Sequence, residues 1–244
     1  MTGRALEELD RRSTPLGEIV LRRRVEPSRQ VDVYEVRLGD EFLMSSLFTV
    51  SETALADLAL GRCDEAGEDG AGEGLDVLVG GLGLGYTARA ALRDRRVRSL
   101  YVVEAIDAVI DWHRNGRVPN AAELTGDARC HLVHGDFFCL IDDVHVVDGG
   151  PDRYDAILVD IDHTPRRHLH PRHGAFYTPD GLRRVAHHLN GDGVFALWSD
   201  AAPDADFIDD LERVFPSTEA HVVTFPNFYT GEESASTVYL ASAT

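Results

Sequence analysis

Lysine is absent from this chain of 244 residues, so all of its 24 basic residues are arginine. A chain without lysine cannot make the lysine–phosphate contact of a P-loop, nor can it form a Schiff base, which excludes pyridoxal-phosphate chemistry. Cysteine is scarce as well. The three cysteines are Cys63, Cys130 and Cys139, and their odd number and unpaired spacing are typical of reduced thiols in a cytoplasmic protein.

Long apolar runs and clustered positive charge are also missing. No run reaches the roughly 20 residues of a membrane-spanning helix, and the charged N-terminus, MTGRALEELDRRSTP, lacks the apolar segment of a secretory signal. The formal charge of −18 argues against a nucleic-acid partner. It is compatible with a cationic substrate or with a simple role in solubility. We therefore expect a cytoplasmic protein that acts on small molecules, with neither nucleic acid nor membrane as a partner.

The first 50 residues are expected to form a small antiparallel β unit. Residues 1–15 are polar and are expected to be frayed. Extended segments follow at 18–24, 31–38 and 42–50, with a hairpin turn at Gly39-Asp40. Residues 51–244 are expected to form the second domain, with a short helix at 54–60 and a flexible, acidic, glycine-rich loop at 61–74.

Beyond residue 74 the sequence alternates between apolar strands and helices. Most of the first five strands lack a polar face, which is typical of a parallel sheet that is covered on both sides. An α/β fold is therefore predicted. The expected strands are 75–80, 99–104, 128–134, 154–160, 193–198, 220–225 and 236–240, and the expected helices are 86–93, 105–114, 179–189 and 204–214.

The stretch 75–89, LDVLVGGLGLGYTAR, has the pattern of a nucleotide-binding strand, turn and helix. Gly81, Gly83 and Gly85 would let the backbone turn tightly and bring a ligand close to the N-terminus of the helix. From Gly83 the same letters also fit the GxGxxA pattern of a dinucleotide site, and a glycine turn that binds no ligand is a further interpretation.

Acidic residues stand where the next three strands end. Glu104 follows the second strand, Asp136 the third, and Asp160 and Asp162 the fourth. In an open α/β sheet the ligand lies at this edge, and a carboxylate after the second strand can accept both ribose hydroxyls. Taken singly, each acid also has a structural interpretation, as a favourable charge at a helix N-terminus, as a helix N-cap or as a solvated loop residue.

With these residues in place, the chain resembles the spermidine synthase (polyamine aminopropyltransferase) family, which has the class I S-adenosylmethionine-dependent methyltransferase fold. The resemblance implies a Rossmann-like, seven-stranded, mostly parallel sheet with a small N-terminal β unit, and a homodimer. The similarity runs from about residue 17 to the C-terminus. Its motifs are VLVGGLGLGYTAR (77–89), YVVEAID (101–107), HGDFF (134–138), YDAILVDIDHTP (154–165), GAFY (174–177) and GDGVF (191–195).

The resemblance also implies a ligand and a site. The cofactor, used as a co-substrate, would be S-adenosylmethionine or its decarboxylated form. Gly81, Gly83 and Gly85 would pass under its methionine-derived part. Glu104 would hold the ribose hydroxyls, Asp136 would bind the adenine amino group, and Asp160 would lie beside the sulfonium and the incoming nucleophile.

The positions expected to bind the second substrate depart from the family pattern. Where the family has a second aspartate, this chain has His163, and Asp162 is the nearest other carboxylate. Of the family's tyrosine-histidine-glutamate segment, Glu52 alone survives, and the glutamine expected after the fifth strand is missing. By position, Glu52 and Tyr177 remain candidates for binding the acceptor.

Transfer from a sulfonium requires an in-line nucleophile and removal of a proton from an ammonium group. Asp160 is the candidate for accepting that proton, and Asp162 or His163 would assist it, since an imidazole titrates near neutral pH. His163 could equally be a plain loop residue.

The loop 163–173, HTPRRHLHPRH, follows the candidate acid and is unusually basic. It could form a lid, and Arg166 and Arg167 would suit an anionic group on the substrate, with Arg172 available as well. A metal site made by His168, His170, His173 and Asp162 is an alternative, but histidines on a loop are more often unliganded, so no metal is expected.

The leading hypothesis is a transferase that moves an aminopropyl or methyl group to an amine-type acceptor. A methyltransferase acting on an anionic small molecule and a non-catalytic protein that binds the nucleoside are alternatives. A third is an NAD-type oxidoreductase, which would leave Asp136 and Asp160 without a role.

Overall fold

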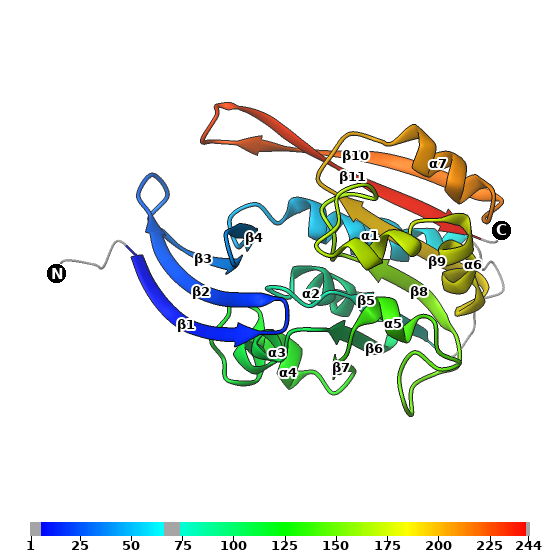
Figure 1. The fold of residues 1–244 in the computed structure, drawn as a ribbon, viewed down its shortest axis with the longest axis horizontal. Helices are drawn as coiled ribbons and strands as arrows, with labels where there is room; N and C mark the ends of the chain where they lie inside the picture. Colours follow the sequence, from blue (N-terminus) through cyan, green and yellow to red (C-terminus); the bar gives the residue numbers. More distant parts are fainter. Residues whose placement is uncertain (1–5, 66–73, 243–244) are drawn as a thin grey trace.

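The computed structural model describes residues 6–65 and 74–242, which form two β-sheets and the helices that cover the larger one (Figure 1). The strands are β1 (Leu6–Thr14), β2 (Gly17–Glu26), β3 (Val31–Leu38), β4 (Glu41–Ser45), β5 (Leu75–Gly80), β6 (Val97–Glu104), β7 (Cys130–His134), β8 (Tyr154–Val159), β9 (Leu189–Ser199), β10 (Ser217–Asn227) and β11 (Glu232–Ser242). The helices are α1 (Val50–Glu65), α2 (Tyr86–Arg93), α3 (Asp107–Arg114), α4 (Ala121–Gly126), α5 (Phe137–Leu140), the 3₁₀ helix η1 (Pro171–Ala175), α6 (Pro179–His187) and α7 (Ala205–Glu212).

The N-terminal sheet is antiparallel, with its strands in the order β1-β2-β3-β4. The expectation that residues 1–15 are frayed is wrong for the described part, because residues 6–14 form a strand that pairs with β2, with one irregularity between Glu8 and Asp10. The sequence LEELDRRST has no apolar alternation. Polar side chains of this strand instead bind to helix α3. Asp10 accepts a hydrogen bond of 2.7 Å from the indole of Trp112 in α3, and Arg12 bonds to Asp111 in the same helix at 2.7 Å.

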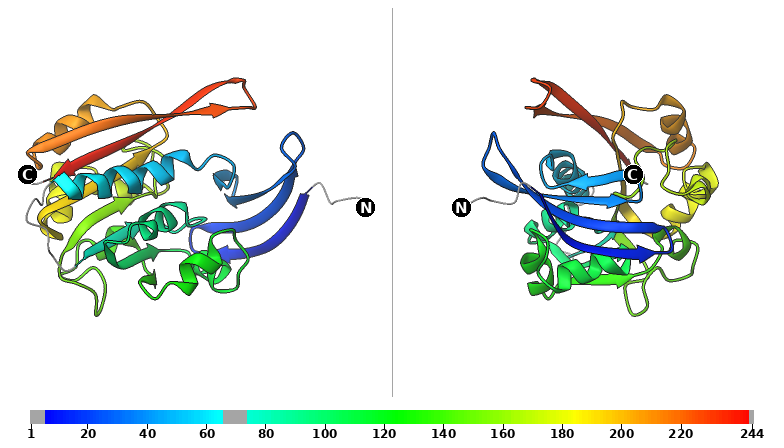
Figure 2. Two further views of the ribbon diagram at one scale, coloured as in Figure 1. Left: turned by 180° about the vertical axis from the view of Figure 1, so that it is seen from behind. Right: turned by 60° about the vertical axis from the view of Figure 1, so that its left-hand side comes forward.

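The larger sheet has seven strands in the order β10-β11-β9-β8-β5-β6-β7. Five of them, β9-β8-β5-β6-β7, are parallel, whereas β11 is antiparallel to β9 and to β10. The β10–β11 hairpin projects past the rest of the sheet, toward the side on which the N-terminal sheet lies (Figure 2). The predicted α/β class, with a seven-stranded, mostly parallel sheet and a small antiparallel unit, is confirmed.

Helix α1 is longer than expected and changes the boundary of the predicted loop. Residues 61–65, expected to belong to a flexible loop at 61–74, are helical; residues 66–73 of that loop lie outside the described residues. The short helices α4 and α5 and the 3₁₀ helix were not expected at all. No helix in the described part of the chain is long and apolar enough to span a membrane.

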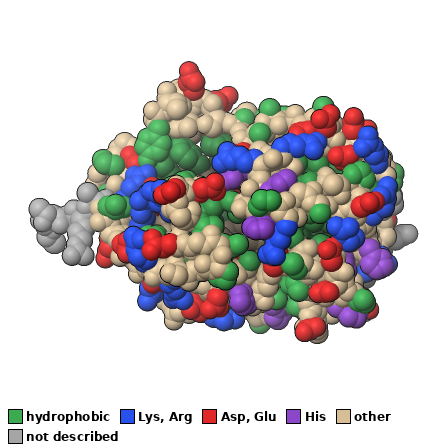
Figure 3. All heavy atoms as spheres, in the orientation of Figure 1, with side chains coloured by type: hydrophobic (Ala, Val, Ile, Leu, Met, Phe, Trp, Pro, Cys, Tyr) green, Lys and Arg blue, Asp and Glu red, His purple; other side chains and the backbone are tan. Residues whose placement is uncertain are grey.

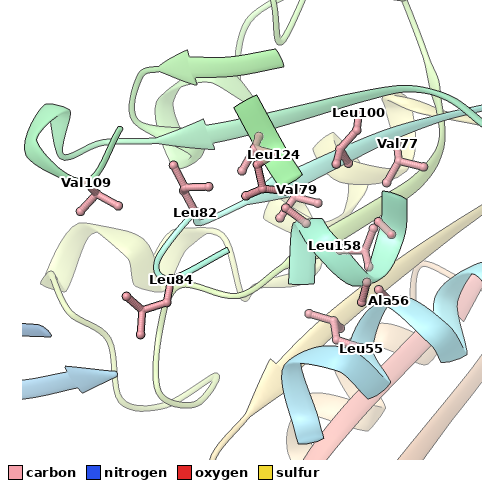
Figure 4. Close-up of a cluster of buried hydrophobic side chains, with 14 of the residues drawn as sticks. Leu55, Ala56, Val77, Val79, Leu82, Leu84, Leu100, Val109, Leu124 and Leu158 are labelled. Carbon is pink, nitrogen blue, oxygen red and sulfur yellow. The ribbon is translucent and has the colours of Figure 1, made fainter. Parts of the chain in front are cut away.

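Both faces of the larger sheet are covered, because the strand residues alternate between two cores. Val77 and Val79 of β5 and Leu158 of β8 pack against residues of α1–α4 (Figure 4). Leu78 and Val159, one residue out of step, face the aromatic core that includes residues of α5, α6 and α7. Because five strands of this sheet are parallel, their carboxyl ends meet at one edge of the sheet. The N-terminal sheet lies at this edge, where Met44 of β4 contacts the loop after β5.

Candidate functional site

The glycine loop after β5 can be built only from glycines. Gly81, Gly83 and Gly85 have φ values of 96°, 48° and 83°, in the left-handed region that side chains disfavour. A Cβ on Gly81 would lie 2.2 Å from the carbonyl oxygen of Asp160, and one on Gly83 would lie 2.9 Å from the sulfur of Met44 in β4. The loop is therefore pressed against the end of β8 on one side and the N-terminal sheet on the other.

Two side chains that the sequence analysis missed hold the carbonyl groups of this loop. The Nε2 atom of His113 lies 3.0 Å from the carbonyl oxygen of Gly83, and Asn120 donates to the carbonyl of Leu84 at 2.8 Å. His113 is fully buried, and burial lowers its pKa, so the ring is neutral and donates from Nε2. Neither residue belongs to a recognisable motif; His113 sits on the buried face of α3 and Asn120 comes just before α4.

Glu104 ends β6 and lies beside the glycine loop. Its two oxygens accept hydrogen bonds from the backbone N–H groups of Leu82, at 3.1 Å, and Ile106, at 2.8 Å. Burial raises the pKa of the carboxyl group, and the backbone donors oppose that rise. The side chain expected to bind the ribose is thus already hydrogen-bonded to the backbone of the glycine loop.

Asp136 follows β7 and caps α5, as its structural interpretation anticipated. One oxygen accepts the N–H of Phe138 at 3.1 Å, and the other accepts Arg172 at 2.6 Å. Arg172 comes from the basic loop, so this loop reaches the residue expected to bind adenine.

Asp160 and Glu52 form the most perturbed pair of carboxyl groups at this edge. Asp160 follows β8, and its Oδ2 atom accepts a hydrogen bond of 2.7 Å from Thr87. Burial raises its pKa to about 6. Glu52 lies in the first turn of α1, where burial and the nearby charge of Asp160 raise its pKa to about 7. Both carboxyl groups therefore bind a proton at higher pH than a solvated carboxylate does.

Asp162 and Tyr177 are committed to building the loop 163–173. Asp162 is 2% exposed and accepts hydrogen bonds from the N–H of Leu169 at 2.6 Å and from the Tyr177 hydroxyl at 2.9 Å. His173 lies 3.0 Å from both of its oxygens. Tyr177 is also buried, and burial raises its pKa well above the usual value. The structure thus places both side chains inside the protein, where they hydrogen-bond to each other.

His163 links the loop to two other elements. Its Nδ1 atom lies 3.5 Å from Asp200, which follows β9, and its Nε2 atom lies 3.9 Å from Glu41 of β4. Nε2 is buried without a hydrogen bond to any described residue.

The arginines expected to bind an anionic substrate do not converge. Arg166 pairs with Asp204 at 2.9 Å, Arg172 pairs with Asp136 as above, and Arg167 is exposed on the loop surface. Figure 3 shows arginine, acidic and histidine side chains interspersed over the face of the molecule seen in Figure 1, with no large area of one charge.

Two of the three histidines considered as metal ligands contact loop backbone, and the third, His173, contacts Asp162 as described above. His168 lies 2.8 Å from the carbonyl oxygen of Pro165, and His170 accepts the N–H of Arg172 at 3.3 Å. Within residues 6–65 and 74–242, no group of three or more histidine, cysteine, aspartate or glutamate side chains is arranged to hold a metal ion.

No protein-family model matches the chain, and no curated protein matches it in sequence. Solved structures match it in fold. The spermidine synthase of Thermotoga maritima has a TM-score of 0.70 at 17% identity, covering 98% of this chain and 73% of that one. A spermidine synthase in complex with the transition-state analogue AdoDATO has a TM-score of 0.71 at 17% identity, covering 98% and 74%. Human methyltransferase-like protein 13, in complex with SAH, has a TM-score of 0.51 at 18% identity, covering 80% of each chain.

These similarities establish the fold. The chain has the spermidine synthase-like, class I methyltransferase fold, so the fold that the sequence resemblance implies is confirmed. The N-terminal sheet is part of the match, because the aligned region covers nearly the whole chain.

Proposed function

We propose that this protein is a transferase that binds S-adenosylmethionine or its decarboxylated form and transfers an aminopropyl or methyl group to an amine. The observation that carries the proposal is the position of Asp160, which packs against Gly81 of the glycine loop and accepts a hydrogen bond of 2.7 Å from Thr87. Burial raises the pKa of its carboxyl group and of Glu52. Two solved structures of this fold contain AdoDATO and SAH, which supports an adenosyl ligand.

Proton affinity near neutral pH is the property that this reaction needs. The amine nitrogen attacks the carbon bound to the sulfonium, the C–S bond breaks with its electrons going to sulfur, and the new N–C bond leaves an extra proton on nitrogen. A carboxylate whose conjugate acid has a pKa of about 6 to 7 accepts that proton effectively at physiological pH. We assign this role to Asp160, whose charge also raises the pKa of Glu52.

The surroundings of the pair favour a cationic acceptor. Glu41 and Asp200 flank His163, which follows Asp160 by three positions in the chain. Arg166 and Arg172, in contrast, are paired with aspartates. An amine that arrives as an ammonium would be attracted to carboxylates and give up its proton there. The alternative of an anionic acceptor would have to depend on Arg167, which is exposed.

Calorimetry and a transfer assay test this proposal. The purified chain is titrated with S-adenosylhomocysteine, methylthioadenosine and NAD, and is then incubated with an amine panel and S-adenosylmethionine or its decarboxylated form, each labelled in the transferred group. We expect an adenosyl ligand to bind and label to reach an amine from one donor. If the adenosyl ligands fail to bind, the proposal is overturned; if they bind without transfer to any amine, the protein is better described as a non-catalytic nucleoside-binding protein.

The variant Asp160→Asn keeps the size of the side chain and removes its ability to accept a proton. We expect the rate of transfer to fall about 10²–10⁴-fold, the usual contribution of a general base. The dissociation constants for methylthioadenosine and S-adenosylhomocysteine should change little, since these are the products of aminopropyl and methyl transfer and each lacks the group transferred in its reaction. A rate equal to that of the wild type would contradict the role of Asp160.

We also propose that the protein is cytoplasmic, because its three cysteines are free thiols, and that it works as a homodimer, by analogy with the family that its motifs resemble. Light scattering on the full chain tests the second point, and a monomer at assay concentration would contradict it.

A further inference from the structure

Thr87 connects the two halves of the candidate site through one hydrogen bond. Thr87 lies in the first turn of α2, directly after the glycine loop that follows β5. Asp160 follows β8, the strand that pairs with β5. The hydroxyl of Thr87 donates to Oδ2 of Asp160 at 2.7 Å. The helix that would face the nucleoside is thereby joined to the acid that would receive the proton.

The bond fixes one oxygen of Asp160 and leaves the other for the acceptor. Oδ1 makes no hydrogen bond to any described residue, so with Oδ2 tied to Thr87 the carboxyl group has a defined rotation. Thr87 is 3% exposed, and its surroundings restrict the hydroxyl in turn. Because a donor stabilises the ionised form, the same bond lowers the pKa of Asp160 against the opposing effect of burial.

We propose that Thr87 is a positioning residue for the transfer step: its hydroxyl holds the carboxyl group of Asp160 in the orientation that receives the proton of the incoming amine. The inference rests on the proposed function, because it specifies how the proton acceptor of that reaction is held. A buried threonine could also serve packing alone, and the hydroxyl would then be incidental.

Valine and serine separate these roles. Thr87→Val keeps the branched shape and removes the hydroxyl, whereas Thr87→Ser keeps the hydroxyl and removes the methyl group. The matched control is Thr125→Val in α4, which removes a hydroxyl that donates to the carbonyl of Ala121 in its own helix.

The first readout is the titration of Asp160, followed by carbon-13 NMR of the carboxyl groups in the full chain and assigned with Asp160→Asn. It requires no turnover. In Thr87→Val we expect the titration midpoint to rise by about one pH unit, because a hydrogen bond to the charged form is lost. Thr87→Ser and Thr125→Val should titrate like the wild type. An unchanged midpoint in Thr87→Val, or the same shift in Thr87→Ser, would overturn the inference.

The second readout is transfer. For Thr87→Val we expect kcat to fall about 10–100-fold and its acidic limb to move to higher pH, with the Kd for methylthioadenosine changed less than about threefold. Thr87→Ser should restore both. Normal kcat in Thr87→Val overturns the inference and leaves the proposed function standing. Absence of transfer in the wild type counts against the proposed function and removes the step that Thr87 would serve, whatever the titration shows.

Discussion

At the residue scale, Glu52 and Asp160 show how distant positions in a sequence set each other's charge. They are separated by more than 100 residues, and the glutamate belongs to the helix that follows the N-terminal sheet. Each is partly buried, and the charge of Asp160 adds to the effect of burial in raising the pKa of Glu52. No spacing rule in the sequence predicts this approach, and only the resemblance to a family pointed to Glu52.

The pair should make the folded state sensitive to pH. Both folded pKa values lie above the unfolded values of 4.5 and 3.8, so between about pH 4 and pH 7 the folded state binds more protons. Stability contributed by these protons is present at low pH and is lost as the pH rises through the folded pKa values. Glu52→Gln removes one charge from the pair, so its melting temperature should exceed that of the wild type by roughly 2–6 °C at pH 8.

The same comparison at pH 4 provides the internal control, because both carboxyl groups of the wild type are then largely protonated and the difference should nearly vanish. Glu233→Gln, on an exposed part of β11, should show no such dependence on pH. Calorimetric melting from pH 4 to pH 8 measures all three proteins. If Glu52→Gln is less stable than the wild type at pH 8, the ionised side chain of Glu52 does not destabilise the folded state.

His113 should control affinity for the nucleoside through the glycine loop. His113→Phe leaves the carbonyl oxygen of Gly83 without its donor, which costs about 1–3 kcal/mol for a buried group. Since this loop would lie under the ligand, we expect the Kd for methylthioadenosine to rise about tenfold. His113→Gln can still donate from the position of Nε2 and should recover most of the affinity; equal losses in both variants would contradict a role for the hydrogen bond.

At the scale of elements, the accuracy of the sequence predictions followed the strength of the local signal. The limits of β5 and α2 were predicted to the residue, because an apolar run, the glycines and a helix-forming segment follow one another without ambiguity. Strand β1 was missed because ion pairs and the indole of Trp112 hold it, and these partners lie far away in the sequence. The sequence predicts a loop at residues 61–65, the last turns of α1, because GRCDE carries no apolar periodicity.

In the basic loop, residues 163–173, the histidines and arginines suggest a site that binds a substrate or a metal. In the structure, three of the histidines instead contact the loop backbone or Asp162. Asp162 acts as the centre of the loop and accepts the hydroxyl of Tyr177. Tyr177→Phe should therefore lower the free energy of unfolding by about 1–2 kcal/mol, or the melting temperature by several degrees. The KM for the acceptor should stay within about twofold, which separates this role from substrate binding.

Tyr154→Phe is the matched control for Tyr177→Phe. The hydroxyl of Tyr154 is equally buried but has no hydrogen-bond partner among the described residues, so its removal should be neutral or slightly stabilising. Denaturant unfolding of both variants measures the difference. If both lose the same stability, the bond to Asp162 contributes nothing.

At the scale of the whole molecule, local ion pairs and the net charge of the chain act over different distances. Many of the described arginines pair locally with carboxylates, as Arg12 does with Asp111 and Arg166 with Asp204, and such exposed pairs contribute little individually. The excess of 18 negative charges remains. Its field extends beyond single pairs and attracts cations toward the surface before any specific contact forms.

This field should make binding of an amine depend on salt while binding of the nucleoside does not. The Debye length shortens from roughly 20 Å or more at 20 mM salt to below 8 Å at 300 mM, so the long-range attraction for an ammonium is screened. We expect the KM for the acceptor to rise severalfold over this range, whereas the Kd for the uncharged methylthioadenosine should stay within about twofold. Steady-state kinetics and calorimetry at the two salt concentrations measure these quantities. If the KM falls with salt, the acceptor is an anion, and the carboxylates around His163 are not its binding partners.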